Sequence, residues 1–171
     1  MKFGIDIGHN LPSDGGAVGH QAENKLVMDL GLLLIKKLKS AGYEAVGCRP
    51  ASANSVVDSL RKRVRTANYH GADVFVSLHF NAFNWSANGT EVYAISSRGK
   101  QIAQSVVNAI AQLGFINRGV KSGSKLHVVR NTNMPAILVE CCFCDSQKDM
   151  DLYDKEKMAE AIFQGLIKTC S

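Results

Sequence analysis

The segment DVFVSLHFNAF, residues 73–83, constrains the fold of this chain more than any other stretch. Its first apolar residues follow one another almost without a break, which is typical of a strand buried on both faces of a sheet. Two polar side chains, His79 and Asn81, stand where this strand is expected to end. The segment therefore predicts a core strand with helices on both sides, and it raises the question of why that strand should finish on an imidazole.

Helix-like and strand-like segments alternate along the whole chain. The helix-like segments have apolar residues at i, i+3, i+4 spacing or follow a capping residue, and they are residues 23–40, 54–71, 98–113 and 155–168. Besides the opening segment, strands are predicted at residues 2–8, 43–48, 89–96, 125–129 and 135–140. No repeat or low-complexity linker interrupts the pattern. We therefore expect residues 1–171 to form a single α/β domain of three layers, with a mixed, mostly parallel, six-stranded sheet and helices on both faces.

Composition limits the partners and the compartment. The net charge of +5 and the pI near 9.0 indicate an acidic partner, which could be nucleic acid, anionic lipid or an anionic polymer such as a cell wall. No apolar run approaches the roughly 20 residues of a membrane helix, so no membrane insertion is expected. The N-terminus has no signal-peptide pattern, which predicts either synthesis in the cytosol or a leader that has been removed.

Two motifs have a simple structural interpretation. The sequence RKRVR at residues 61–65 could be a nucleic-acid patch, but no aromatic residues are interleaved with it. Val64 belongs to the apolar line of its helix, so we expect the basic residues around it, Arg63 included, to form a solvated face and no nucleic acid to bind. Five cysteines are an odd number, and three are crowded into ECCFCD, which favours a reducing compartment of synthesis over a disulfide framework. For Cys141 and Cys144, a redox role is less favoured than simple packing.

Ionisable residues fall where a binding site is expected in this kind of fold. Ligands of open α/β sheets bind beyond the carboxyl ends of the strands, and His9, His79 and Glu140 stand at three such ends. Glu23 opens the first helix. Each residue has an alternative role, because a histidine can be an ordinary surface residue and Glu23 could complement the helix dipole. If the three strands are neighbours, however, all four side chains converge.

Two histidines and a carboxylate are a common catalytic zinc set, which leaves a fourth position open for water or substrate. A further carboxylate that does not bind the metal is then needed to transfer protons. Glu140 is the candidate, because a carboxylate that directly follows four apolar residues is expected to be partly buried.

The motifs together resemble those of the zinc-dependent N-acetylmuramoyl-L-alanine amidases, a family that includes bacterial autolysins and phage endolysins. The resemblance runs through the whole chain and rests on DIGHN, DGGAVG, Glu23, LRKRVRTANYHGADVFVSLHFNA, GTEVY, NRGVK, LHVVRNTNMPAILVECCF and MAEAIFQGL. One departure is Cys142, which stands where the family usually has glycine, next to Glu140.

The resemblance implies a site and a reaction. His9, Glu23 and His79 match the positions of the zinc ligands, and Glu140 matches that of the catalytic glutamate. The family hydrolyses the amide between the lactyl group of N-acetylmuramic acid and the L-alanine of the stem peptide, so peptidoglycan outside the cytoplasm is the expected substrate. For Asn81 and Arg130, substrate binding and a structural role remain open.

We expect a monomer, and two alternatives to the amidase remain open. The first is a zinc peptidase that cuts the stem peptide. The second is a basic wall-binding module without catalysis.

Overall fold

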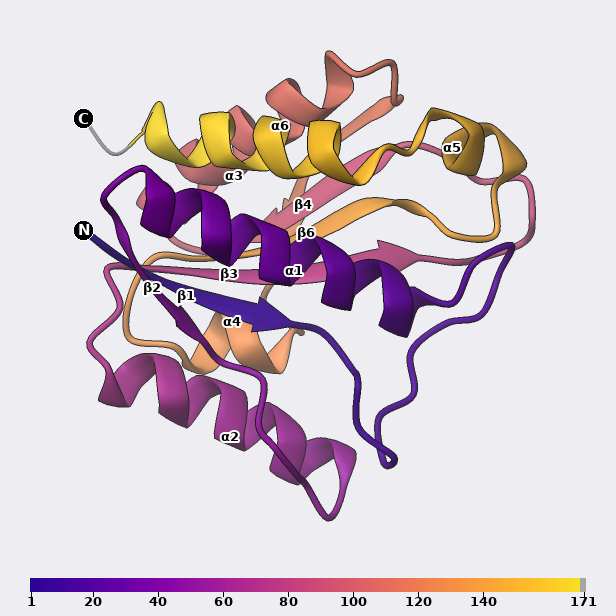
Figure 1. Ribbon diagram of the computed structural model, residues 1–171. Helices are drawn as coiled ribbons and strands as arrows, with labels where there is room; N and C mark the ends of the chain where they lie inside the picture. The colour runs from indigo at the N-terminus through magenta and orange to yellow at the C-terminus, as the bar shows by residue number, and fades with distance from the viewer. Residues whose placement is uncertain (170–171) are drawn as a thin grey trace.

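A six-stranded sheet runs through the middle of the computed structural model, which describes residues 1–169 (Figure 1). Its order is β2-β1-β3-β6-β4-β5. The first four strands in this order are parallel, and β4 joins β6 in the antiparallel sense while it pairs with β5 in parallel. The sheet is therefore mixed and mostly parallel, as predicted. The strands are β1 (Lys2–Ile7), β2 (Glu44–Gly47), β3 (Val74–Asn81), β4 (Thr90–Ala94), β5 (Asn117–Ser122) and β6 (Ala136–Phe143).

Helices cover both faces of the sheet, which confirms the three-layer α/β domain (Figure 1). One face is covered by α1 (Glu23–Ser40), α3 (Ser97–Ala111) and α6 (Lys155–Ile167). The other face is covered by α2 (Val56–Tyr69) and the short α4 (His127–Asn131). A further short helix, α5 (Gln147–Leu152), follows β6. The predicted domain also included Cys170 and Ser171, which lie outside the described residues.

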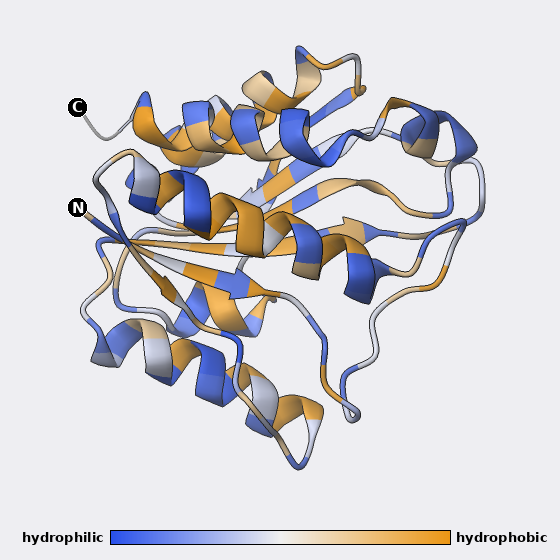
Figure 2. Cartoon of the chain, in the orientation of Figure 1, coloured by the Kyte–Doolittle hydropathy of each residue, from blue (hydrophilic) through white to orange (hydrophobic). Residues whose placement is uncertain are grey.

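The helices form where capping and apolar spacing agree. Ser55, Ser96 and Asp154 each accept a backbone N–H hydrogen bond at the start of a helix, which typically stabilises a helix by about 1 kcal/mol. In α6 the apolar residues Met158, Ile162 and Leu166, spaced four apart, are fully buried. Figure 2 shows the result, because apolar colour gathers on the central strands and hydrophilic colour on the outer faces of the helices.

The prediction of the fifth strand was wrong. Residues 125–129 were expected to be a strand, but residues 127–131 form the helix α4. The fifth strand is instead β5, residues 117–122. The polar strand β5 lies at the edge of the sheet and pairs only with β4, so it leaves no apolar pattern in the sequence. Val128 and Val129 are both buried, and one helical turn places these consecutive side chains against the α2 side of the sheet.

No helix among residues 1–169 has the length and the apolar character required to cross a bilayer.

Candidate metal centre

The carboxyl ends of three neighbouring strands carry the predicted site residues. β3 lies between β1 and β6, and the register pairs Ile7 with Leu78 and His79 with Glu140. His79 and Glu140 lie within their strands rather than after them, because β3 continues to Asn81 and β6 to Phe143. The condition for convergence of the four residues is therefore met, with His79 and Glu140 side by side across the sheet.

Three side chains converge closely enough to hold a metal ion between them. His9 Nε2 lies 3.3 Å from Glu23 Oε1, and His79 Nδ1 lies 3.1 Å from the same oxygen. One possible ligand atom from each residue lies within 4.8 Å of the other two. The two imidazole rings meet edge to face, with centroids 4.7 Å apart. Two imidazole nitrogens and one carboxylate oxygen are a donor set that zinc accepts.

Glu23 is held in place from several sides. It is the first residue of α1 and is 3% exposed. The backbone N–H groups of Ala17 and Phe80 donate to its two carboxylate oxygens at 2.8 and 3.0 Å. Burial alone would raise the pKa of Glu23, but the hydrogen bonds from the two histidines outweigh burial and hold this pKa well below its usual range. The carboxylate therefore has a role in this cluster, beyond complementing the dipole of α1.

His9 lies in the loop after β1, and a second carboxylate orients its ring. Asp14 Oδ1 lies 2.5 Å from His9 Nδ1, which leaves Nε2 directed toward Glu23. Burial would lower the pKa of His9, but the carboxylates of Glu23 and Asp14 outweigh burial and raise this pKa to about 9. Gly8, next to His9, leaves room for the His79 ring, because a Cβ at position 8 would lie 2.6 Å from that ring. Asp14, in the turn-rich segment before α1, was not predicted as a site residue.

Glu140 lies next to the three candidate ligands and is only partly exposed. No described residue donates a hydrogen bond to its carboxylate. Burial, together with the negative charges of Glu23 and Glu91, raises the pKa of Glu140 to about 7, against an opposing contribution from His79. A carboxyl group with a pKa near neutrality is suited to both accept and return a proton.

Asn81 and Glu91 lie on β3 and β4, the two strands that flank the strand of Glu140. Glu91 is the cross-strand partner of Glu140 in β4 and is 5% exposed. Asn81 Nδ2 donates to Glu91 Oε1 at 3.3 Å, and Arg118 Nε donates to Glu91 Oε2 at 2.9 Å. Sequence reasoning did not single out Glu91, although an acidic residue inside the apolar strand GTEVYAIS was an available signal.

Arg130 and His20 are not part of this cluster. Arg130 is exposed on α4 and borders a shallow hollow beside Ala136, at the start of β6. The interpretation of Arg130 as a substrate-binding residue therefore stays a prediction. His20 is exposed, and its ring meets the ring of Trp85 with centroids 5.2 Å apart.

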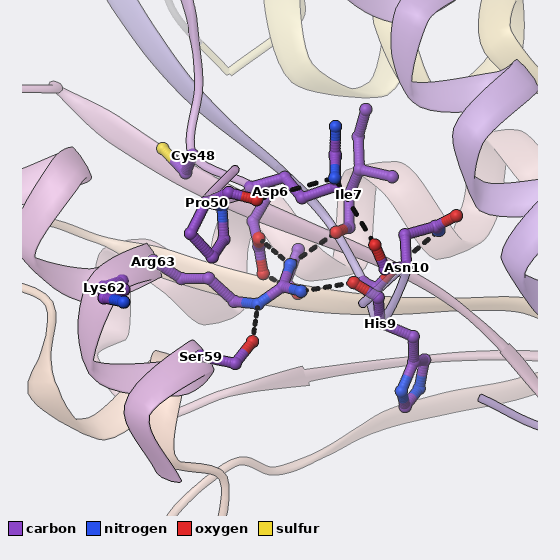
Figure 3. A network of polar contacts seen from close by, with 12 residues as sticks. Asp6, Ile7, His9, Asn10, Cys48, Pro50, Ser59, Lys62 and Arg63 are labelled. Atoms are coloured by element: carbon purple, nitrogen blue, oxygen red, sulfur yellow. Dashed lines mark hydrogen bonds and ion pairs between the residues drawn. The ribbon is translucent and has the colours of Figure 1, made fainter. Parts of the chain in front are cut away.

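The expectation of a solvated basic face on α2 was wrong for Arg63. Its side chain is 1% exposed and donates to Asp6, Ser59 and the backbone oxygens of Ile7 and His9 (Figure 3). The reason is helical spacing, because Arg63 lies four residues after buried Ser59 and four before buried Ala67. The buried partner in β1, Asp6, could not be identified without the tertiary structure.

The described cysteines are packed in the core. Cys48, Cys141, Cys142 and Cys144 are free and fully buried. Burial raises the pKa of Cys144 to about 11 and that of Cys141 well above its usual range. These thiols stay protonated near neutral pH, which does not favour a redox role for the Cys-x-x-Cys pair. Cys142 fills space beside Glu140 as an ordinary core side chain.

Comparison with known proteins identifies similar chains. The family described as N-acetylmuramoyl-L-alanine amidase matches residues 4–169. An uncharacterised protein of Clostridium perfringens is 33% identical over 170 residues, which cover 95% of this chain and 49% of that protein, so this chain spans about half of its length. The endolysin of Bacillus phage SPP1 is 34% identical over 173 residues, covering 94% of this chain and 61% of the endolysin.

A solved structure has the same fold. The catalytic domain of CwlV, an N-acetylmuramoyl-L-alanine amidase from Bacillus (Paenibacillus) polymyxa var. colistinus, is 30% identical and superposes with a TM-score of 0.86. The match covers 99% of this chain and 97% of that domain.

Proposed function

The chain belongs to the N-acetylmuramoyl-L-alanine amidase family, and from this premise we propose that it is a zinc-dependent peptidoglycan hydrolase. The bond that it cleaves is the amide between the lactyl group of N-acetylmuramic acid and the L-alanine of the stem peptide. The observation that carries this proposal is the meeting of His9, Glu23 and His79 beside Glu140. The same proposal places its action on the cell wall, outside the cytoplasm.

The donor set of the three residues fits zinc. His9 would bind through Nε2, because its Nδ1 faces Asp14, and His79 would bind through Nδ1, which faces Glu23. Zinc binds two imidazoles and a carboxylate in many hydrolases and keeps one position open. When bound there, zinc acidifies water, polarises a carbonyl group and stabilises the negative charge that develops on its oxygen.

Glu140 transfers the protons in the proposed reaction. Its carboxylate accepts a proton from the attacking water while the oxygen of that water forms a bond to the lactyl carbonyl carbon. The proton then passes to the nitrogen of L-alanine as the C–N bond breaks. The products are the lactyl carboxylate and a free α-amino group on L-alanine. The raised pKa of Glu140 supports both halves of this transfer.

Asn81 lies beside the reacting groups in the proposal. Its side-chain oxygen accepts a hydrogen bond from the backbone N–H of Ala82, and its amide nitrogen donates to Glu91, which fixes its orientation. We propose that it borders the bound stem peptide.

Digestion of purified cell wall tests this proposal. We expect new N-terminal alanine in the digest, and we expect a zinc chelator to abolish it until zinc is restored. New amine ends on other residues would support the zinc peptidase instead. Binding to the wall with neither metal nor new ends would support the non-catalytic module. Either result would refute the amidase proposal.

A further inference from the structure

Arg63 and Asp6 form a buried ion pair beneath the loop that carries His9. Arg63 Nη1 lies 2.6 Å from Asp6 Oδ1, and each side chain is 1% exposed. Ser77 Oγ donates to the other oxygen, Asp6 Oδ2, at 2.7 Å. Two charges withdrawn from water cost several kcal/mol each unless partners compensate them, and the pair supplies that compensation.

The guanidinium has further donors, and they point at the backbone that leads to the metal centre. Arg63 donates through Nη1 to Ile7 O and through Nη2 to His9 O. In Figure 3 the guanidinium faces the His9 backbone, whereas the His9 ring points away from it. The planar fork of arginine therefore holds two carbonyl groups, one on each side of Gly8.

The backbone held in this way adopts a conformation that side chains rarely take. His9 has φ 51° and Asn10 has φ 64°, both in the left-handed region, where the Cβ of an L-residue crowds the following carbonyl oxygen. Asn10 is held by its own contacts, since its N–H donates to Asn24 Oδ1 at 3.2 Å and its Nδ2 donates to Gly8 O at 3.0 Å. The carbonyl oxygen of His9 accepts its hydrogen bond from Arg63 Nη2.

The same guanidinium reaches the His9 ring through other side chains. Arg63 Nε donates to Ser59 Oγ at 3.0 Å, and Ser59 Oγ donates to Asp14 Oδ2 at 3.3 Å. Arg63 Nη2 also lies 3.8 Å from Asp14 Oδ2. The other oxygen of Asp14 contacts His9 Nδ1. Arg63 thus acts on both the backbone and the ring of His9.

From these contacts we propose that Arg63 is a positioning residue for the metal ligand His9. Arg63 binds the backbone carbonyl groups on either side of Gly8, and it holds Asp14 against the His9 ring. This inference rests on the proposed zinc site. Replacement of such partners of metal ligands typically costs 10–100-fold in metal affinity.

Zinc affinity, measured by competition with a chromophoric chelator, tests the proposal on the whole chain. The main variant is D6N/R63M, which removes both charges together and leaves neither unpaired in the core. We expect its zinc affinity to fall roughly 10- to 100-fold. The absorption spectrum of bound Co²⁺ should change as well, because the position of one ligand has changed.

Two controls separate positioning from general loss of stability. R65M makes the same side-chain change on an exposed residue of α2, and it should bind zinc like the wild type. V64A removes buried apolar volume from the same helix, and it should unfold more easily yet keep the wild-type zinc affinity.

The outcomes distinguish this inference from the proposed function. If the wild type binds no zinc through His9, Glu23 and His79, the proposed function fails. If the wild type binds zinc and D6N/R63M binds it equally well with the same Co²⁺ spectrum, the positioning role alone is overturned. Should D6N/R63M not fold, R63K decides, because an ammonium group keeps the charge but cannot reproduce the fork. Unchanged zinc affinity in R63K would likewise overturn the role.

Discussion

Two polar clusters lie along β1 and β3 and differ in how completely their charges are paired. The lower cluster consists of Asp6, Arg63 and Ser77, and the upper cluster of His9, Glu23 and His79 beside Glu140. In the lower cluster Asp6, Arg63 and Ser77 are at most 1% exposed, and they bond to one another. In the upper cluster the side chains of His9 and His79 are 25% and 18% exposed. A cluster whose charges are paired internally can hold its neighbours in place but offers no site for a ligand. The upper cluster brings two imidazole rings and a carboxylate to one partly exposed point, which suits a metal ion.

Protons occupy the upper cluster in the metal-free protein. The pKa of His9 is raised to about 9 and that of Glu140 to about 7, so His9 holds a proton throughout the neutral range and Glu140 in its lower part. Because a metal needs His9 Nε2 without its proton, zinc binding should release protons and weaken as the pH falls.

The largest expected effect is the loss of a metal ligand. H79A should reduce both bound zinc and amidase activity to background, because two ligands hold zinc far more weakly than three. Metal analysis and wall digestion measure the two quantities. The exposed His70 provides the control H70A, which should retain both. Activity that persists in H79A without zinc would remove the upper cluster from the mechanism.

Loss of proton transfer should come next in size. E140Q keeps the shape of the side chain but cannot accept a proton, so the rate of wall hydrolysis should fall by roughly 10²–10⁴-fold. Zinc content should stay at the wild-type level, in contrast to H79A. The exposed Glu156 on α6 offers a matched control, E156Q. A rate near that of the wild type would show that Glu140 is not the proton-transferring residue.

Breaking the lower cluster should lower stability as well as zinc affinity. R63M leaves Asp6 buried without its partner, which should lower the free energy of unfolding by about 3–5 kcal/mol. Urea unfolding of the metal-free protein measures this loss. D6N/R63M should recover part of it, because no unpaired charge remains. If R63M and the exposed R65M lose equal stability, the buried ion pair is not the cause.

The smallest effect should appear as a pH dependence of stability. Glu140 has a pKa of about 7 in the folded, metal-free protein, above its ordinary 4.5. Below pH 4.5 the carboxyl group is protonated in both the folded and the unfolded protein, and the free energy of unfolding is at its full value. As the pH rises from 4.5 through 7, the unfolded protein ionises this group more easily than the folded protein does, so the free energy of unfolding falls. E140Q should therefore match the wild type in acid and be more stable above pH 7, by at most about 3 kcal/mol. Unfolding curves at several pH values, recorded in chelator, measure the difference. Equal stability at every pH would show that the carboxyl group is not perturbed.

Sequence reasoning found the residues of the upper cluster because their signal is local. A polar residue after a run of apolar ones marks the carboxyl end of a buried strand, and this rule placed His79 and Glu140. Their joint placement with His9 and Glu23 depended on one condition, that the three strands are neighbours. The strand order β1-β3-β6 meets it.

The supporting residues were missed because their partners are distant. Arg63 looked like part of a solvated basic face until its partner Asp6, 57 residues away in the sequence, was located. Asp14 and Glu91 were not singled out, because their contacts with His9, Asn81 and Arg118 join separate segments of the chain. The strand β5 was missed for a different reason, because an edge strand needs no apolar pattern in its sequence.

The sequence by itself determined the α/β class, the apolar strands, the long helices and the residues at the strand ends. These features follow from the periodicity of side chains within one segment, which is written locally in the chain. The tertiary structure decided which strands are neighbours, that His9, Glu23 and His79 come within 4.8 Å, and that Arg63 lies under His9 rather than in solvent. Such contacts depend on the packing of segments far apart in the chain, and no local pattern specifies them.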